Sequence, residues 1–282
     1  MADRRPAPYL LLLLVVVVVI WGSYPTLVKI ALRDMPPLTL AALRCTLASG
    51  LLVTLLWRSA DPGERPITRA DVPGLVVLGL AGIAASTGSY YLAIELTSAS
   101  NAVILTATTP VFVAVGGHLF FGERLRSVQW TGVAGSALGV LLTVTRGELR
   151  LFEAPPRAGD GIALLGQVAW ATYTLYGKRV LARLSPRAAT AAAYLVGTAV
   201  LIPLAVILAP IFPAVVPPTR FSSLPAWGVV LFQGTLGTLS HVWYYRGVQA
   251  IGPSVTAIFM NLQPLVGVAL AILVGVWLTT RR

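Results

Sequence analysis

The sequence predicts an all-α integral membrane protein of ten helices, arranged as two inverted repeats of five. Three observations support this fold class: a series of long apolar runs, a low content of charge, and an internal repeat. Only 11% of the residues are charged and 56% are hydrophobic, whereas soluble domains carry about 25% charged residues. The chain therefore lacks the charged residues that a water-facing surface needs.

Nine apolar runs are each long enough to cross a membrane as a helix. A bilayer core of about 30 Å needs about 20 apolar residues, and only a helix satisfies its backbone polar groups within one segment. The first run continues through Trp21 without a small-residue cleavage motif, so we expect a retained helix rather than a signal peptide. The runs occupy residues 9–30, 38–57, 73–93, 102–121, 128–145, 159–178, 188–209, 225–245 and 251–272, and an apolar tail continues to 280.

An internal repeat divides the chain into residues 1–148 and 149–282. Trp21 and Tyr24 recur as Trp170 and Tyr173 at an offset of 149. At an offset of 154, Ser86, Tyr90, Tyr91 and Pro110 recur as Ser240, Tyr244, Tyr245 and Pro264. Because the repeated unit contains five spans, an odd number, the second copy enters the membrane from the opposite side, which predicts inverted repeats.

The distribution of basic residues predicts that both termini are cytoplasmic. With the N-terminus inside, fourteen of the 21 Lys and Arg residues fall in inner segments and six in outer ones, leaving Arg44 within a span. Such a bias is typical of membrane proteins, and it accounts for the formal net charge of +11 without a nucleic-acid partner. We expect a multi-pass protein of a bacterial-type inner membrane.

The second copy is shorter than the first near its end. Between Pro264 and Gly275 the offset falls from 154 to 136, so about 18 residues after about position 273 are absent from the second copy. We expect a truncated or partly missing tenth helix. The sequence leaves open whether the segment that joins helices nine and ten is truly deleted, in which case the C-terminus lies outside.

Short motifs connect this organisation with a known family. Trp21-Gly22-Ser23 opens the first span, residues 98–102 (Ser-Ala-Ser-Asn-Ala) precede Pro110, and residues 122–125 (Gly-Glu-Arg-Leu) close the fourth span. In this order the motifs resemble those of the drug/metabolite transporter (DMT) superfamily, specifically its EamA-domain exporters, over nearly the whole chain. The chain looks most like the YddG-type exporters of aromatic and other amino acids. The resemblance implies ten helices, a central cavity between the two halves and alternating access.

Aromatic and hydroxyl residues at matching positions are candidates for substrate binding. Trp21 and Tyr24 share a helical face because they lie three residues apart, and Trp170 and Tyr173 do the same. We expect this set to form an aromatic cavity wall; the alternative is packing between helices or at the membrane interfaces. Its other members are Ser86, Tyr90, Tyr91, His241, Tyr244 and Tyr245.

Polar side chains within the spans add further candidates. The amides of Asn101, Asn261 and Gln263 either bind substrate or join helices, since an unbonded amide in hydrocarbon is costly. Arg44 is expected to snorkel or to bond backbone carbonyls. Glu123 is expected to pair with the arginines that follow it at the membrane interface.

Two prolines and two lysines occupy equivalent positions in the copies. Pro110 and Pro264 are expected to kink their spans, because proline lacks an N–H and bends a helix. Lys29 and Lys178 lie near opposite membrane faces, where they either gate access or anchor the ends of spans.

Groups that other functions require are missing from the spans. All ten acidic residues fall between spans or at their ends, so we expect no coupling through a buried carboxylate, and predict uncoupled transport or exchange. One cysteine and two histidines are too few for a metal site of the usual type, and we expect no cofactor. An integral membrane enzyme would need catalytic motifs that the sequence lacks.

The expected function is export of small metabolites across the lipid bilayer, above all aromatic and other neutral amino acids. The main alternative is an exporter of organic cations, which usually needs an embedded carboxylate. Small residues such as Gly132 and Gly135 in the fifth span permit close helix packing, either within the bundle or in a homodimer.

Overall fold

All regular secondary structure is helical in the part that the computed structural model describes, which is residues 8–58, 65–96, 106, 108–123, 125–144, 158–208, 219–267, 269, 270 and 273. This confirms the all-α prediction for those residues, whereas the division into ten helices and inverted repeats stays a prediction. Four helical segments in the described ranges are long and apolar enough to cross a membrane: Pro8–Ala31, Pro37–Arg58, Arg69–Leu96 and Pro186–Leu208.

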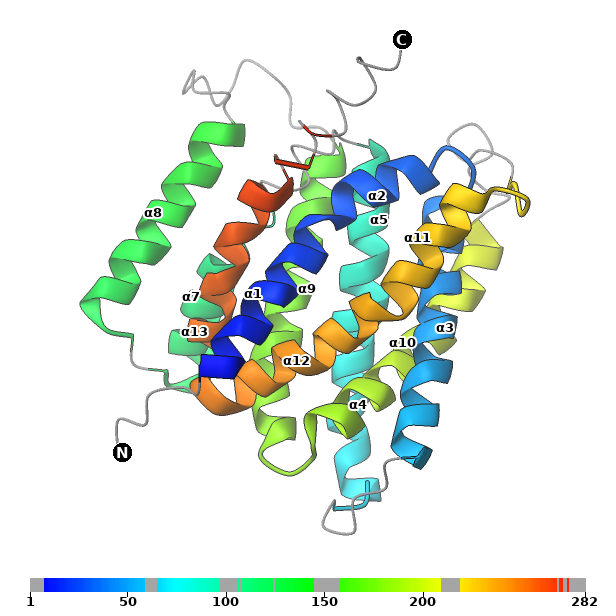
Figure 1. Cartoon of the computed structure of the whole chain (residues 1–282). Coiled ribbons are helices and arrows are strands. Elements are labelled where there is room, and N and C mark those ends of the chain that lie inside the picture. The colour runs from blue at the N-terminus through cyan, green and yellow to red at the C-terminus, as the bar shows by residue number, and fades with distance from the viewer. Residues whose placement is uncertain are drawn as a thin grey trace.

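The helices of the two halves are interleaved in one bundle (Figure 1). From the first half, α3 packs along α10, α5 along α9, and α1 along α12. Neither half therefore builds the interior alone. The elements are α1 (Pro8–Gly22), α2 (Tyr24–Ala31), α3 (Pro37–Arg58), η1 (Arg69–Asp71), α4 (Val72–Leu78), η2 (Gly79–Ala85), α5 (Ser86–Leu96), α7 (Thr109–Phe121), α8 (Ser127–Val144), α9 (Ala158–Leu181), α10 (Pro186–Leu208), α11 (Leu224–Gly234), α12 (Leu236–Ile251), α13 (Pro253–Ile258) and η3 (Phe259–Leu262).

The first predicted span is broken in its middle, between α1 and α2. Pro25 has no N–H to offer the carbonyl of Trp21, one turn earlier, so the ladder of helical hydrogen bonds is interrupted there. The hydroxyl of Ser23 donates to the carbonyl of Ile20 at 2.6 Å. The break places Trp21 and Tyr24 at the junction of two helical pieces.

A π-helical stretch, η2, interrupts the third span just before Ser86. Wide turns of this kind are rare and are frequently found at functional sites. Here the stretch is pressed against the second half of the chain. A Cβ at Gly82 would overlap the ring of Tyr173, and a Cβ at Gly197 would overlap the side chain of Ile83. The glycines therefore let η2 approach α9 and α10 closely, which holds the start of α5 in place.

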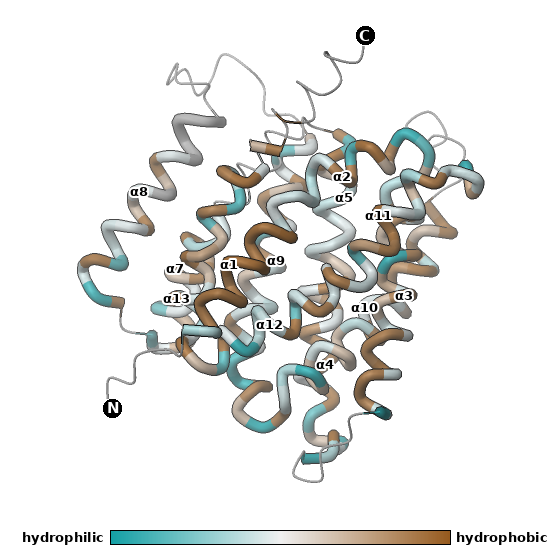
Figure 2. The backbone as a smooth tube through the Cα atoms, viewed as in Figure 1, coloured by the Kyte–Doolittle hydropathy of each residue, from teal (hydrophilic) through white to brown (hydrophobic). Residues whose placement is uncertain are grey.

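Charged side chains are paired at the two ends of the bundle. At one end Asp71 lies 3.5 Å from Arg183 and 3.7 Å from Arg65. At the other end Asp34 lies 3.8 Å from Arg220. Figure 2 shows the same pattern, with hydrophilic colour collected at the ends and hydrophobic colour along α1 and α3. Every acidic residue in the described ranges lies at a helix end or in a turn, as predicted: Asp34, Asp71, Glu95, Glu123 and Asp160.

Helix α8 lies at the margin of the bundle (Figure 1) and packs against α7. A Cβ added at Gly132 or Gly135 would meet no atom of the described chain within 4 Å. These glycines therefore serve no close helix packing within the described part of the bundle. The homodimer suggested by the sequence stays a prediction.

Candidate functional site

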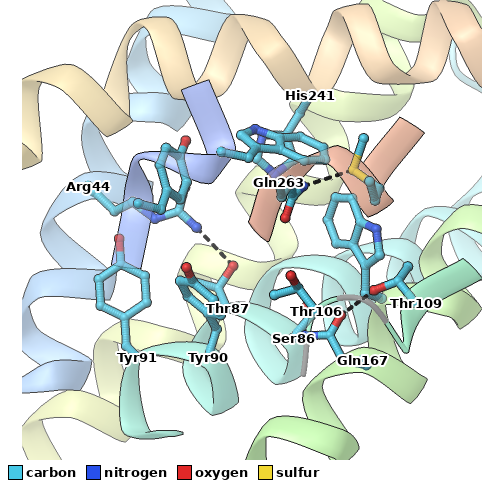
Figure 3. A pocket seen from close by; sticks show the side chains of 14 residues that line it. Arg44, Ser86, Thr87, Tyr90, Tyr91, Thr106, Thr109, Gln167, His241 and Gln263 are labelled. Atoms are coloured by element: carbon cyan, nitrogen blue, oxygen red, sulfur yellow. Dashed lines mark hydrogen bonds between the residues drawn. The ribbon is translucent and has the colours of Figure 1, made fainter. Parts of the chain in front are cut away.

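A cavity of about 90 Å³ lies where α1, α2, α3, α5, α7, α9, α12 and η3 meet (Figure 3). It is smaller than the roughly 300–1,000 Å³ typical of sites for drug-sized ligands. Eight of the residues that the sequence analysis proposed for substrate binding line it: Trp21, Tyr24, Ser86, Tyr90, Tyr91, Trp170, His241 and Gln263.

One wall of the cavity is aromatic and combines residues from both halves of the chain. The rings of Trp21 and Trp170 lie edge to face, with centroids 5.2 Å apart. The ring of His241 lies 4.9 Å from Trp21 and 5.5 Å from Trp170, centroid to centroid. The indole N–H of Trp21 donates to the hydroxyl of Ser240 at 2.6 Å, so this ring is held in one orientation. Edge-to-face contacts of this kind are favourable beyond the area that they bury.

The hydrogen bonds of His241 indicate which tautomer its neutral ring adopts. Nδ1 lies 2.8 Å from the carbonyl oxygen of Gly237, which accepts only, so Nδ1 carries the proton. Nδ1 also lies 3.2 Å from the hydroxyl of Tyr194. In the neutral ring, Nε2 is then an acceptor.

Neutral polar groups line the rest of the cavity. The hydroxyl of Thr109 donates to the side-chain oxygen of Gln167, and both side chains are buried. The amide nitrogen of Gln263 lies 2.9 Å from the sulfur of Met260. None of these groups carries a charge, so they offer hydrogen bonds and shape rather than a counter-ion.

Arg44 is the one charged side chain among the described residues that line the cavity. It is 3% exposed. Nη2 donates to the hydroxyl of Thr87 at 2.9 Å, Nη1 lies 3.4 Å from the hydroxyl of Tyr194, and the guanidinium carbon lies 5.6 Å from the centroid of the Tyr91 ring. Nε has no hydrogen-bond partner among the described residues.

The prediction that Arg44 snorkels or bonds carbonyls is therefore wrong. Its position on α3 faces α5 and α10 rather than lipid, and its partners there are hydroxyls and a ring. Burying an ion of this size costs several kcal/mol even after the protein relaxes, whereas a desolvated cation–π contact contributes about 2 kcal/mol. The neighbouring hydroxyls and aromatic ring compensate part of the positive charge, but no described carboxylate neutralises it.

Three predicted residues lie behind the aromatic wall and do not line the cavity. Tyr173 and Tyr245 stack with ring centroids 4.5 Å apart, and the hydroxyl of Tyr245 donates to the carbonyl of Tyr173 at 3.1 Å. The hydroxyl of Tyr244 bonds that of Thr174 at 3.1 Å. All three tyrosines are fully buried, so they position the wall.

The remaining predicted residues are not brought to the cavity. Asn261 lies in η3 and does not line it, and Asn101 lies outside the described residues. Pro110 occupies the first turn of α7, where its missing N–H breaks no hydrogen bond of that helix. Most of the predicted span before it lies outside the described residues, so the expected kink stays a prediction. Pro264 follows η3, at the change from 3₁₀ to α geometry.

The two lysines lie at opposite ends of the bundle. Nζ of Lys29 donates to the carbonyl of Ile94 at 2.9 Å, at the C-terminal end of α5. Nζ of Lys178 lies 2.9 Å from a carboxylate oxygen of Glu123, whose other oxygen accepts from Ser254. Both lysines thus join helix ends, whereas anchoring at the membrane faces and gating stay predictions.

Glu123 connects three helices at the end of the bundle where α9 finishes. Gly122 ends α7 in a left-handed conformation (φ 64°) that turns the chain toward α13. The described partners of Glu123 come from α9 and α13, and Arg124, one of the arginines that the sequence suggested, lies outside the described residues. A second, polar cavity of about 340 Å³ lies beside Glu123, Lys178 and Ser254.

Six cavity-lining residues are missed or misinterpreted by sequence reasoning. Arg44 and Gln167 carry a usable signal, because a polar side chain inside an apolar span usually faces the bundle interior. The others are ordinary small or apolar residues whose positions only the packing reveals. The six are Arg44, Thr87, Thr106, Thr109, Gln167 and Met260.

Comparison with known proteins places the chain among transporters. The sequence profile of the EamA-like transporter family matches residues 8–145 and 157–282. An uncharacterized transporter of Archaeoglobus fulgidus is 33% identical over 249 residues, which cover 88% of this chain and 82% of that protein. The uncharacterized transporter YyaM of Bacillus subtilis is 24% identical, with 91% and 83% covered.

Two further similarities concern function and fold. A probable amino-acid metabolite efflux pump of Salmonella typhimurium is 29% identical over 175 residues, which cover 61% of this chain and 54% of that protein. A solved crystal structure superposes with a TM-score of 0.71 at 20% identity, covering 95% of this chain and 90% of the other. At that identity the superposition shows the fold alone.

Proposed function

Because this chain belongs to the EamA-like transporter family, we propose that it exports small metabolites, above all neutral amino acids, through the cavity beside Trp21 and Trp170. The family match supports a membrane transporter rather than an enzyme. The substrate class, the direction of transport and an inner-membrane location are the parts that we propose.

The observation that carries the proposal is the combination of an aromatic wall with one buried cation, Arg44, among the described residues that line the cavity. Trp21, Tyr90 and Trp170 present ring surfaces that suit flat or aliphatic side chains. The same rings attract an ammonium group by a cation–π contact of about 0.5–2 kcal/mol. A zwitterion with an apolar side chain therefore matches the lining of the cavity in both polarity and charge.

Organic cations fit the same cavity poorly. Their exporters usually rely on a carboxylate inside the membrane, and none lines the cavity among the described residues. Arg44 would repel a cation at short range, and low local polarity would strengthen that repulsion. The efflux pump of Salmonella typhimurium, which is named for amino-acid metabolites, supports the same choice from an independent direction.

Transport requires the cavity to open to each side in turn. In the described residues one end of the bundle is joined by Glu123, Lys178 and Ser254. Lys29 joins helix ends at the other side. We propose that breaking and remaking these contacts accompanies alternating access, without coupling to a proton gradient.

The test is transport by the full chain reconstituted into liposomes. Uptake of labelled phenylalanine, labelled threonine and an organic cation is measured with and without a pH gradient. We expect uptake of the amino acids without a gradient, and no accumulation above the external concentration. Gradient-dependent uptake of the cation, with no flux of either amino acid, would show that the protein is a drug antiporter instead.

A further inference from the structure

We propose that Arg44 binds the carboxylate of the transported molecule, so that a carboxylate, rather than an α-amino group, defines the substrate. The inference rests on the proposed function because it concerns the same cavity. It extends the substrate class to organic monocarboxylates that have no amino group. It also predicts that amino acids with a blocked carboxylate are excluded.

The hydrogen bonds of Arg44 leave part of its capacity to donate unused. The group has five N–H donors. Among the described residues, Thr87 accepts one from Nη2 at 2.9 Å and Tyr194 lies 3.4 Å from Nη1, while Nε has no partner. A carboxylate accepts two parallel bonds from one edge of a guanidinium. Nε–H and a neighbouring N–H form such an edge.

The charge of Arg44 also calls for an anionic ligand. The acidic side chains for which ion pairs are found in the described chain lie at the bundle ends, where Asp34, Asp71 and Glu123 pair with other cations. No described carboxylate lines the cavity. A buried charge is stable only when it is paired or otherwise compensated. One cation matches one negative charge, which favours a monocarboxylate over a phosphate dianion.

The side chains on the other side of the cavity indicate the direction in which such a ligand extends. Figure 3 shows Arg44 at one side and the pair Thr109 and Gln167 at the other, with Ser86 and Thr106 between them. A ligand whose carboxylate meets Arg44 therefore reaches toward neutral hydroxyl and amide groups. An ammonium group finds no described carboxylate there and only the weaker attraction of the aromatic rings, so it contributes less to recognition than the carboxylate does.

Competition in liposomes containing the wild-type chain gives the first test. Labelled phenylalanine uptake is measured against 3-phenylpropionate, which has the carboxylate only, and against phenylalaninamide, which has the ammonium only. We expect the inhibition constant of the amide to be at least about tenfold higher than that of the acid, the loss of one charge-assisted pair. Equal inhibition by the two compounds would overturn the proposal.

Failure of the proposed function is distinguishable from failure of this inference. If the wild type takes up no phenylalanine, the export proposal falls. Binding of 3-phenylpropionate and phenylalaninamide to the purified chain, followed by tryptophan fluorescence, then still decides the role of Arg44. Tighter binding of the acid supports the role, and equal or absent binding of both contradicts it.

Variants separate recognition from a purely structural role. Arg44→Gln removes the charge and Arg44→Lys keeps it without the fork, whereas Arg58→Gln changes an exposed arginine at the end of the same helix. We expect the preference for acid over amide to fall about tenfold in Arg44→Gln, to be partly retained in Arg44→Lys, and to be unchanged in Arg58→Gln. If Arg44 only holds helices together, uptake falls but the acid-to-amide ratio stays constant. If Arg44→Gln does not fold, the acid-to-amide preference of Arg44→Lys is compared with that of the wild type. A reduced preference supports the proposal, and an unchanged preference contradicts it.

Discussion

Trp21 and Trp170 lie edge to face, with ring centroids 5.2 Å apart and planes at 89°, although 149 residues separate them in the chain. The two tryptophans occupy matching positions in a sequence pattern that occurs twice in the chain. The contact therefore joins the two halves at the wall of the cavity. This relationship makes the indole pair the natural place to perturb substrate binding without disturbing the ends of the bundle.

Replacing Trp170 by alanine should weaken transport of aromatic substrates. Edge-to-face and stacked contacts contribute about 0.5–1.5 kcal/mol beyond buried area, so we expect kcat/KM for phenylalanine uptake to fall about tenfold in Trp170→Ala. Trp170→Phe, which keeps a ring, should retain most of the activity. The control is Trp57→Ala, since Trp57 is 91% exposed at the end of α3. Equal losses in Trp57→Ala and Trp170→Ala would contradict a role for the wall.

The approach of η2 to α9 should make Gly82 intolerant of a side chain. A Cβ there would overlap the ring of Tyr173, and overpacking of this kind typically destabilises a protein by about 1–3 kcal/mol. We expect Gly82→Ala to lower the unfolding temperature in detergent. Gly50→Ala on α3 is the matched control, because its Cβ would meet nothing within 4 Å. It should be neutral or slightly stabilising, since alanine favours a helix by about 1 kcal/mol over glycine. A stable Gly82→Ala variant would mean that η2 packs less closely than described.

Tyr91 and Gln233 form a buried hydrogen bond between α5 and α11, and both side chains are fully buried. Tyr91→Phe keeps the ring but leaves the oxygen of Gln233 unpaired, which should destabilise the fold by about 1–3 kcal/mol. The double variant Tyr91→Phe/Gln233→Leu removes both partners and should recover much of that loss. Thermal unfolding of the wild type, Tyr91→Phe, Gln233→Leu and the double variant measures the interaction energy of the pair as a double-mutant cycle. Strictly additive losses would show that the two side chains do not interact.

Removing the carboxylate of Glu123 should loosen one end of the bundle. Glu123→Gln loses the ion pair with Lys178 and weakens the contact with Ser254, so water should reach the adjacent polar cavity more often. The readout is the rate at which a maleimide labels Val255→Cys, which lines that cavity, in a chain whose buried Cys45 is replaced by serine. We expect faster labelling. Asp34→Asn, at the opposite end, is the control and should leave the rate unchanged. No difference between the two variants would argue against a closing role for Glu123.

Several residues of the site can be predicted from the sequence alone. Trp21 and Trp170 stand out because they recur at matching positions in a repeat. Ser86 and Tyr90 follow from a shared helical face, since residues four positions apart are neighbours on a helix surface. Tyr91 follows from its recurrence as Tyr245. Of these six residues, all but Tyr245 line the cavity.

Other residues cannot be placed in this way. Tyr173 shares a helical face with Trp170 at the level of sequence spacing, yet it packs behind the cavity against Tyr245. Sequence reasoning expects Arg44 to snorkel or to bond carbonyls, yet it points inward to Thr87 and Tyr194. Helical periodicity relates residues on one helix to one another, but it does not say how that helix is rotated within the bundle.

The sequence by itself therefore determined the helical membrane fold, the family and the pairs of matching aromatic residues. These depend on local composition, on span length set by the bilayer, and on repetition along the chain. The tertiary structure alone decided which face of each helix meets the cavity. That rotation is set by contacts between distant segments, such as the place where Gly82 admits the ring of Tyr173, and through them Arg44 becomes the single charge in the described cavity wall.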